Sequence, residues 1–181
     1  MYAMNDMKAQ QIVQGVEAVD GVLQSLDAHK VFLVVDSSFR FLSIRDRILS
    51  MKVPYVMFDR FSPNPLYEDV CEGVSLFLKE GCDAIVAVGG GSCIDVAKCV
   101  KLYCKMDPSV NYLRQDGFDS GIPVVAVPTT AGTGSESTRF AVIYFEGEKQ
   151  SVNHLSIIPD CAILDHTVLT TLPLYQKKCT V

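Results

Sequence analysis

The chain has 181 residues, of which 49% are hydrophobic and 20% charged, and its formal net charge is −5. That composition is typical of a globular protein with enough apolar material for a core, so it excludes intrinsic disorder. The acidic balance, without a run of Lys or Arg, argues against nucleic-acid binding. The polar N-terminal residues 1–11 and the strand-length apolar runs predict neither a signal peptide nor a membrane span, so we expect a cytoplasmic protein.

The seven cysteines are odd in number and contain no C-x-x-C pair. Together with the lack of an export signal, this predicts buried free thiols in a reducing compartment. His29, His154 and His166 form no short-spaced pair, so we expect no metal site built from this chain alone.

The first half of the chain alternates between helical and extended patterns. An apolar stripe predicts a helix over residues 10–26. A β-branched run at 31–35 predicts a strand, and the polar residues that follow it are typical helix caps. We then expect a helix over 39–51, a strand over 55–58 and a turn at 63–65.

The second half continues the alternation. We predict a helix over 66–79 that Gly81 ends, a buried strand over 84–88 and a helix over 93–104. Further strands are expected at 123–127, 140–145 and 162–164, with a polar loop at 129–137 and a polar turn at 146–149. Such alternation predicts an α/β fold with a mainly parallel, doubly wound (Rossmann-like) sheet flanked by helices, and we treat residues 1–181 as one dinucleotide-binding domain.

Three glycines, Gly89, Gly90 and Gly91, lie between the buried strand at 84–88 and the next helix. Glycine lets the backbone approach a phosphate and adopts positive φ, and the free N–H groups of a helix start attract anions. Ser92 adds a hydroxyl donor or a helix cap. The alternative is a tight turn without a ligand; we favour phosphate binding, although the run matches neither G-x-G-x-x-G nor a P-loop.

Asp36 ends the strand at 31–35. A carboxylate at this position accepts hydrogen bonds from the adenosine ribose and repels a 2′-phosphate, which favours NAD over NADP. The alternative is that Asp36 only caps the next helix. Because the glycine run is expected nearby, we favour the ribose interpretation.

Hydroxyl-bearing and small residues follow the strand at 123–127, in the segment 128–136 (PTTAGTGSE). Ligands bind at this carboxyl edge of open α/β sheets, so these hydroxyls are candidate ribose or phosphate ligands, although a well-capped loop is the alternative. Asp95 and Lys98 lie three apart and are expected to pair on one helix face. Most such pairs are solvated surface contacts; the other possibility is that Lys98 supports the glycine loop.

Taken together, these segments resemble the iron-dependent (group III) alcohol dehydrogenase family. The resemblance rests on Asn64-Pro65, on 81–98 (GCD leading into GGGSCIDVAK), on 128–136, and on 159–165 (PDCAILD), in the family's order. Dehydroquinate synthases and glycerol dehydrogenases share the glycine–Asp–Ala–Lys element, whereas the TTAGTGSE loop resembles the alcohol dehydrogenase branch.

The resemblance implies an α/β nucleotide domain followed by an all-helical domain. We expect this chain to be the first of the two, without the helical domain and with no catalytic residue of its own. The cofactor-binding residues that it implies for NAD, or NADP, are Asp36, Gly90, Gly91, Ser92, Asp95, Thr129, Thr130, Thr133, Thr138 and, on the nicotinamide side, Lys149.

In this family a divalent metal, iron or zinc, is bound by one Asp and several His of the helical domain. Residues 172–181 resemble the approach to its first metal-bearing helix, and His166 replaces the family's usual Pro. We therefore expect the metal only in the full-length architecture.

Three functions remain open at this point. The first is an NAD(P)-dependent alcohol dehydrogenase, interconverting a small alcohol and an aldehyde or ketone, of which this chain is the nucleotide-binding part. The others are a non-catalytic nucleotide-binding module and a structural remnant that self-associates. The glycines, Asp36 and the Thr-rich loop favour nucleotide binding, and the missing metal ligands predict an inactive isolated chain. The family suggests a homodimer.

Overall fold

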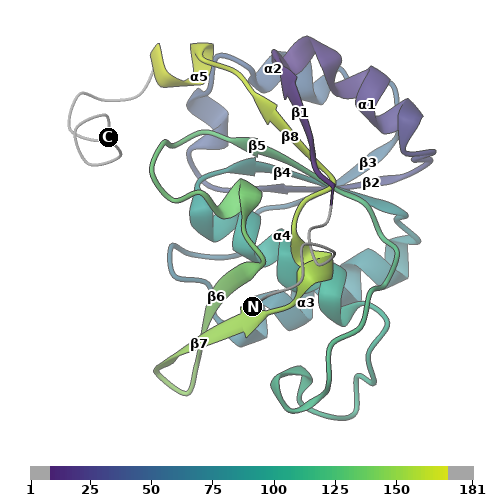
Figure 1. Ribbon diagram of the computed structural model, residues 1–181, viewed down its shortest axis with the longest axis vertical. Helices are drawn as coiled ribbons and strands as arrows, with labels where there is room; N and C mark the ends of the chain where they lie inside the picture. Colours follow the sequence, from purple (N-terminus) through teal and green to yellow (C-terminus); the bar gives the residue numbers. More distant parts are fainter. Residues whose placement is uncertain (1–8, 171–181) are drawn as a thin grey trace, which may run out of the picture.

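The computed structural model describes residues 9–170, which form three layers, a parallel sheet with helices on both faces (Figure 1). The sheet order is β1-β8-β5-β4-β2-β3, and all neighbouring strands are parallel. This confirms the predicted doubly wound α/β fold. The strands are β1 Gln11–Gln14, β2 Val31–Val35, β3 Tyr55–Phe58, β4 Ala84–Gly89, β5 Val124–Pro128 and β8 Cys161–Leu164.

The helices divide between the two faces of the sheet (Figure 1). α1 (Val19–Ser25) and α2 (Arg45–Leu49) cover one face, and α3 (Tyr67–Glu80) and α4 (Gly91–Tyr103) cover the other. As predicted, Gly81 ends α3, with a left-handed φ of 65°. The short elements are η1 Val16–Ala18, η2 Phe39–Phe41, η3 Tyr112–Arg114, η4 Ser135–Ser137, η5 Leu155–Ile157, α5 Thr167–Thr170, and the strands β6 Phe140–Phe145 and β7 Glu148–Asn153.

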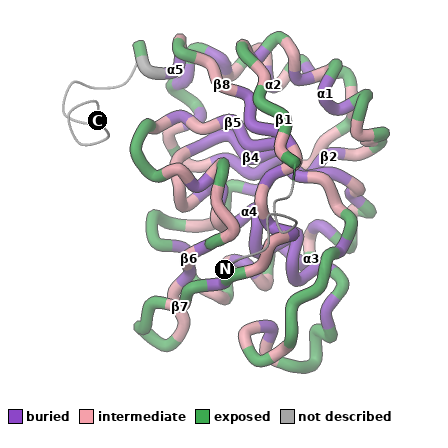
Figure 2. The backbone as a smooth tube through the Cα atoms, viewed as in Figure 1, coloured by how far each residue is buried: buried purple, intermediate pink, exposed green. Residues whose placement is uncertain are grey.

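Two apolar cores lie on either side of the central strands, which are buried along their whole length (Figure 2). Successive side chains of a strand point to opposite faces. Phe32 and Val34 of β2 therefore join the core beneath α3 and α4, whereas Val31, Leu33 and Val35 join the core beneath α1 and α2. Burying one apolar side chain of this size contributes about 1.5–3 kcal/mol to the free energy of folding.

The order of the strands reverses between β2 and β4. From β2 the chain moves outward to β3, and it then crosses back to β4 on the other side of β2. Ligands of open α/β sheets bind at such a switch point, outside the carboxyl ends of the strands. Asp36 follows β2 and Gly90 follows β4, so the fold brings these two predicted residues together.

The predicted helix over 10–26 is wrong in its first third, which forms the edge strand β1. Gly15, with a φ of 81°, separates this strand from η1 and α1. The apolar pair Ile12 and Val13 is compatible with a helix and with a strand. The segment is a strand because it pairs with β8. This is a tertiary contact that local periodicity does not encode.

The predicted helix over 39–51 is also wrong, because it breaks into η2 and α2 around an extended Leu42. Leu42 and Ile44 are both buried, and residues two apart cannot face the same side of one continuous helix. The break lets both side chains enter the core.

The predicted polar turn at 146–149 is only the tip of a hairpin whose second strand, β7, was not predicted. β6 and β7 pair antiparallel, apart from the main sheet. β7 was missed because its sequence, EKQSVN, is almost wholly polar and most of its residues are exposed. The other predicted strands are found within one residue of their expected bounds.

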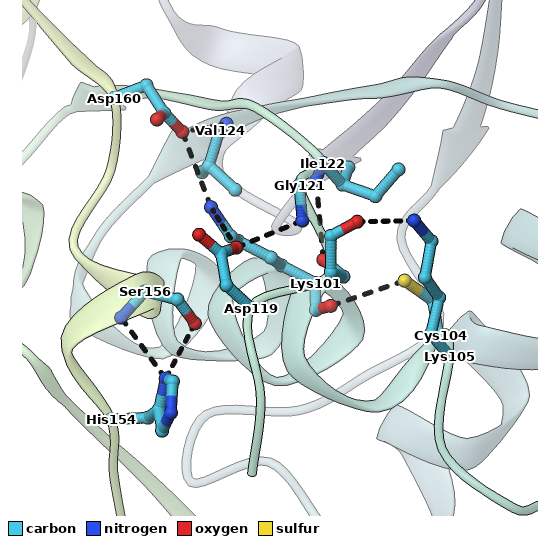
Figure 3. Close-up of polar contacts among 11 residues, drawn as sticks. Lys101, Cys104, Lys105, Asp119, Gly121, Ile122, Val124, His154, Ser156 and Asp160 are labelled. Atoms are coloured by element: carbon cyan, nitrogen blue, oxygen red, sulfur yellow. Dashed lines mark hydrogen bonds and ion pairs between the residues drawn. The ribbon is translucent and has the colours of Figure 1, made fainter.

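Buried charge anchors α4 at the amino edge of the sheet (Figure 3). The Nζ atom of Lys101, a residue only 2% exposed, lies 3.5 Å from an Asp160 carboxylate oxygen and 3.9 Å from one of Asp119. The same Asp160 oxygen accepts from the Val124 N–H at 2.8 Å. α4 is therefore tied to the starts of β5 and β8, away from the glycine run.

The six cysteines within residues 9–170 are all free, and five of them are buried, as predicted; Cys179 lies outside the described part. Among the helices of the described residues, none combines the length and apolar composition needed to cross a bilayer.

Candidate nucleotide-binding site

The glycine run serves close packing rather than an unusual backbone conformation. A Cβ on Gly89 would lie 2.5 Å from the Cys93 Cβ and 2.7 Å from an Asp36 carboxylate oxygen. A Cβ on Gly91 would lie 3.1 Å from the Thr133 methyl. None of the three glycines has a positive φ, so that part of the prediction is wrong. Glycine is required because helix, strand end and loop approach too closely for a side chain.

Asp36 joins the ends of β2 and β4. One of its carboxylate oxygens accepts from the Gly90 N–H at 3.3 Å. The other accepts from the N–H and hydroxyl of Ser38, which holds the turn into η2. The alternative that Asp36 caps the next helix is wrong, because the N-cap of η2 is Ser38 and Asp36 instead holds the turn before it. Contact with a ribose stays a prediction.

α4 begins directly after the glycine turn, with Gly90 as its N-cap. Its first turn contains no acidic residue, and no side chain caps it. Free N–H groups and the helix dipole therefore present positive potential at this end of the helix. Ser92 lies inside the first turn, so the idea that it caps the helix is wrong; its hydroxyl oxygen accepts from the Asn64 N–H at 3.4 Å.

A hollow of about 430 Å³ opens beside this helix start. It lies between α4, the Thr-rich loop and the β6–β7 hairpin. Five predicted residues line it directly at the helix and loop, namely Gly91, Ser92, Asp95, Thr133 and Thr138, and Lys149 reaches it from β7. Sequence reasoning missed the contributions of Phe140, Val142 and Tyr144, because the hairpin was not predicted as a unit.

A second hollow, of about 350 Å³, lies on the other side of the Thr-rich loop. Gln14, Pro128 and Leu164 place it at the carboxyl ends of β1, β5 and β8. Thr130 lines it, and so does His166. Thr129 is 2% exposed, and its N–H donates to the Gly89 carbonyl at 3.0 Å. Thr129 therefore fixes the loop to the glycine turn and lies below the surface.

Asp95 and Lys98 are not a solvated surface pair, as was expected. The Lys98 side chain is fully buried. Its Nζ donates to the Thr138 and Phe140 carbonyls at 2.8 and 2.9 Å. Asp95 accepts from the Ser135 hydroxyl at 2.5 Å and from the Val142 N–H at 3.0 Å.

Burial also controls the charge of these two groups. It lowers the pKa of Lys98 to about 8, against the opposing effect of the Asp95 carboxylate. It raises the pKa of Asp95, although hydrogen bonds from Ser135 and Val142 act in the other direction. Losing solvation disfavours the charged form of either group, so both pKa values move toward neutrality.

The described residues offer no binding site for the metal ion expected from the family resemblance. Within residues 9–170, no group of three or more His, Cys, Asp or Glu side chains is arranged to hold a metal ion. We therefore derive no chemical step through a metal in this part of the chain.

The family model described as iron-containing alcohol dehydrogenase matches residues 9–166, nearly the whole described region. The chain belongs to the iron-containing alcohol dehydrogenase family. This confirms the resemblance found in the glycine run, the Thr-rich loop and the segment 159–165.

Members of this family share both sequence and fold with the chain. The chain is 40% identical over 120 residues to the probable alcohol dehydrogenase EutG of Escherichia coli K12. The aligned region covers 64% of this chain and 30% of that protein. The crystal structure of 1,3-propanediol oxidoreductase superposes with a TM-score of 0.88 at 28% identity, covering 96% of this chain and 48% of that one.

One structural neighbour was solved with a nucleotide. Sulfoacetaldehyde reductase from Bifidobacterium kashiwanohense, in complex with NAD+, has a TM-score of 0.80 at 27% identity and covers 91% of this chain and 46% of its own. The present chain thus spans less than half the length of each of these three family members.

Proposed function

We propose that this chain is the nucleotide-binding part of an NAD-dependent alcohol dehydrogenase, which interconverts a small alcohol and the corresponding aldehyde or ketone. The observation that carries this proposal is the uncapped start of α4, which follows β4 at the switch point of the parallel sheet and opens on a 430 Å³ hollow. Family membership and the NAD+-bound neighbour support it.

The two hollows suit a ligand with two nucleoside parts joined by a pyrophosphate. The N–H groups of Gly91 and Ser92 would bind the pyrophosphate. We place the nicotinamide in the larger hollow, because Lys149, the residue expected on the nicotinamide side, lines it. The apolar Leu164 and Val168 suit the second hollow to the adenine. Asp36, between the ends of β2 and β4, would accept from the adenosine ribose and disfavour a 2′-phosphate.

The chain's own residues would bind and orient the cofactor. Bound NAD+ would accept a hydride from the alcohol carbon, while the hydroxyl proton leaves to a base. We assign neither that base nor a metal ligand to residues 9–170. The alternative, a non-catalytic nucleotide-binding module, is favoured by the lack of a metal-binding group in the described residues.

A titration with NADH and NADPH, followed by nicotinamide fluorescence with and without iron or zinc, tests the proposal. We expect saturable binding that prefers NADH and ignores the metal. Asp36→Asn removes the charge that opposes a 2′-phosphate, so it should narrow the NADH preference by about tenfold.

Asp83→Asn is the matched control. Asp83 also accepts backbone N–H groups, from His29 and Lys30, but at the amino edge of the sheet. Its replacement should leave the preference unchanged. If neither nucleotide binds, the proposal fails; NADH binding without oxidation of an alcohol is the result expected of this chain, which we predict to be inactive by itself.

A further inference from the structure

The outer edge of β6 in the β6–β7 hairpin is paired with no other strand of the described part of the chain. β6 pairs with β7 through one side, so the backbone groups on its other side need different partners. The Tyr144 N–H donates to the Pro65 carbonyl at 2.9 Å, and the Val142 N–H donates to Asp95. The Phe140 carbonyl and, just before the strand, the Thr138 carbonyl both accept from Lys98.

Lys98 is thus the hydrogen-bond donor for the free backbone carbonyls at the start of β6. Its ammonium has three N–H groups and four acceptors within 3.3 Å, two carbonyls and the hydroxyls of Ser135 and Thr138. Ser135 also donates to Asp95, so the three side chains form one connected network. The network fastens η4 and β6 to α4 beneath the larger hollow, whose lining includes Ser135, Thr138 and Phe140.

We infer that Lys98 is a positioning residue of the nucleotide site: its buried ammonium holds the hairpin edge and the Thr-rich loop against α4, and nucleotide affinity depends on that ammonium. The inference rests on the proposed function. Lys98 does not line the hollow itself, and it acts through Thr138 and Ser135, which do.

Loss of the Lys98 proton would weaken this network. A neutral amine has two N–H groups and a lone pair, so one acceptor loses its donor and the remaining bonds are no longer charge-assisted. The ionisable groups around Lys98 are Asp95 and Cys99 on its own helix and Glu136 on η4, while β6 presents backbone carbonyls. Burial raises the pKa of Cys99, which keeps that thiol neutral, so Lys98 is the group expected to titrate first above neutrality.

Affinity and folding stability should respond to pH in opposite directions. The folded chain loses the Lys98 proton near pH 8, whereas the unfolded chain keeps it up to about 10.5. Between these values the unfolded state binds more protons, so this group makes the fold more stable as pH rises. Nucleotide binding, which requires the ammonium, should weaken over the same range.

The test is the dissociation constant for NADH between pH 6.5 and 9.5, measured on the 181-residue chain. For the wild type we expect a constant value up to about pH 7.5 and an increase on the order of tenfold by pH 9.5. Lys98→Met should bind about tenfold more weakly at pH 7 and show no such increase.

Lys101→Met is the matched control, because Lys101 is equally buried on the same helix but pairs with Asp160 and Asp119 at the opposite edge of the sheet (Figure 3). It should be less stable yet keep the wild-type pH profile of binding. A flat wild-type profile, or wild-type affinity in Lys98→Met, would overturn the inference.

Hydrogen exchange separates this inference from the proposed function. At pH 7, the Val142 and Tyr144 amides should exchange faster in Lys98→Met than in the wild type. In Lys101→Met these two amides should exchange no faster, after the rates are corrected for that variant's change in global stability. A chain that binds no NADH at any pH refutes the proposed function. Unchanged exchange in Lys98→Met refutes the network itself.

Discussion

At the scale of single residues, the glycine run illustrates how a fold constrains a sequence without any ligand present. Gly89 faces Cys93 on one side and Asp36 on the other, and both are held by their own contacts. The Cys93 thiol donates to the Val34 carbonyl at 3.3 Å. Neither neighbour can move without breaking a connection between β2, β4 and α4.

Gly89→Ala should therefore destabilise the protein by about 1–3 kcal/mol, because the new Cβ overlaps Cys93 and Asp36. Urea unfolding measures the loss. Gly21→Ala is the control, since a Cβ there meets nothing within 4 Å and lies in α1. That variant should gain about 0.5–1 kcal/mol, because alanine favours helix. Equal effects at the two positions would contradict the packing argument.

At the scale of elements, short helices depend on side chains that tie them together. Asp20 of α1 accepts from the Lys52 N–H at 2.8 Å and from the Arg47 guanidinium at 2.9 Å. The Lys52 N–H is the main cause that lowers the pKa of Asp20 below its ordinary 3.8, with Arg47 adding to it. One carboxylate thus fixes α1 against the end of α2, which has only five residues.

Asp20→Asn should cost about 1 kcal/mol at pH 7, since it removes charge-assisted hydrogen bonds at a partly exposed site. A lowered folded-state pKa gives stability that is present above pH 4 and is lost as pH falls through that pKa. The stability difference between wild type and variant should therefore shrink in urea titrations below pH 4. Asp46→Asn, which alters an exposed pair with Arg45, should show no measurable difference at any pH.

The two strands that were not predicted share a cause. β1 and β7 are short, largely exposed strands with few apolar residues to mark a buried face. Their extended conformation is set by the partner strand, β8 for one and β6 for the other. The buried strands β2, β4 and β5 were predictable because continuous β-branched and apolar runs of that length are typical of parallel sheets.

At the scale of the whole molecule, the two cores share the same strands. Ile85 and Ala87 of β4 belong to one core, and Ala84, Val86 and Val88 of the same strand belong to the other. If one core were lost, one face of these strands would be exposed to water. The same strands form part of the other core, which would lose its support. The two cores should therefore unfold together.

We expect a single urea transition whose midpoint is the same by far-ultraviolet circular dichroism and by tyrosine fluorescence, within about 0.2 M. The chain has no Trp, and Tyr67, Tyr103 and Tyr112 all lie in or against the core beneath α3 and α4. Fluorescence thus reports mainly on one core, and dichroism on both. Two separate midpoints would show that the cores unfold independently.

The sequence by itself determined the fold class, the family and half of the residues that line the larger hollow. Gly91, Ser92 and Thr133 were identified because a glycine run and a hydroxyl-rich loop each follow a buried strand, and parallel strands bring such segments to one edge; Thr138 was implied by the family resemblance alone. These are local patterns, and local physics is sufficient to recognise them.

Only the tertiary structure decided how Asp95 and Lys98 are used. Spacing along a helix says which residues share a face, but burial depends on what packs against that face. Here the partner is the edge of β6, part of a hairpin whose polar second strand gave no local signal. The low-polarity surroundings that lower the pKa of Lys98 come from segments about 40 residues away in sequence, so no short window of the sequence contains them.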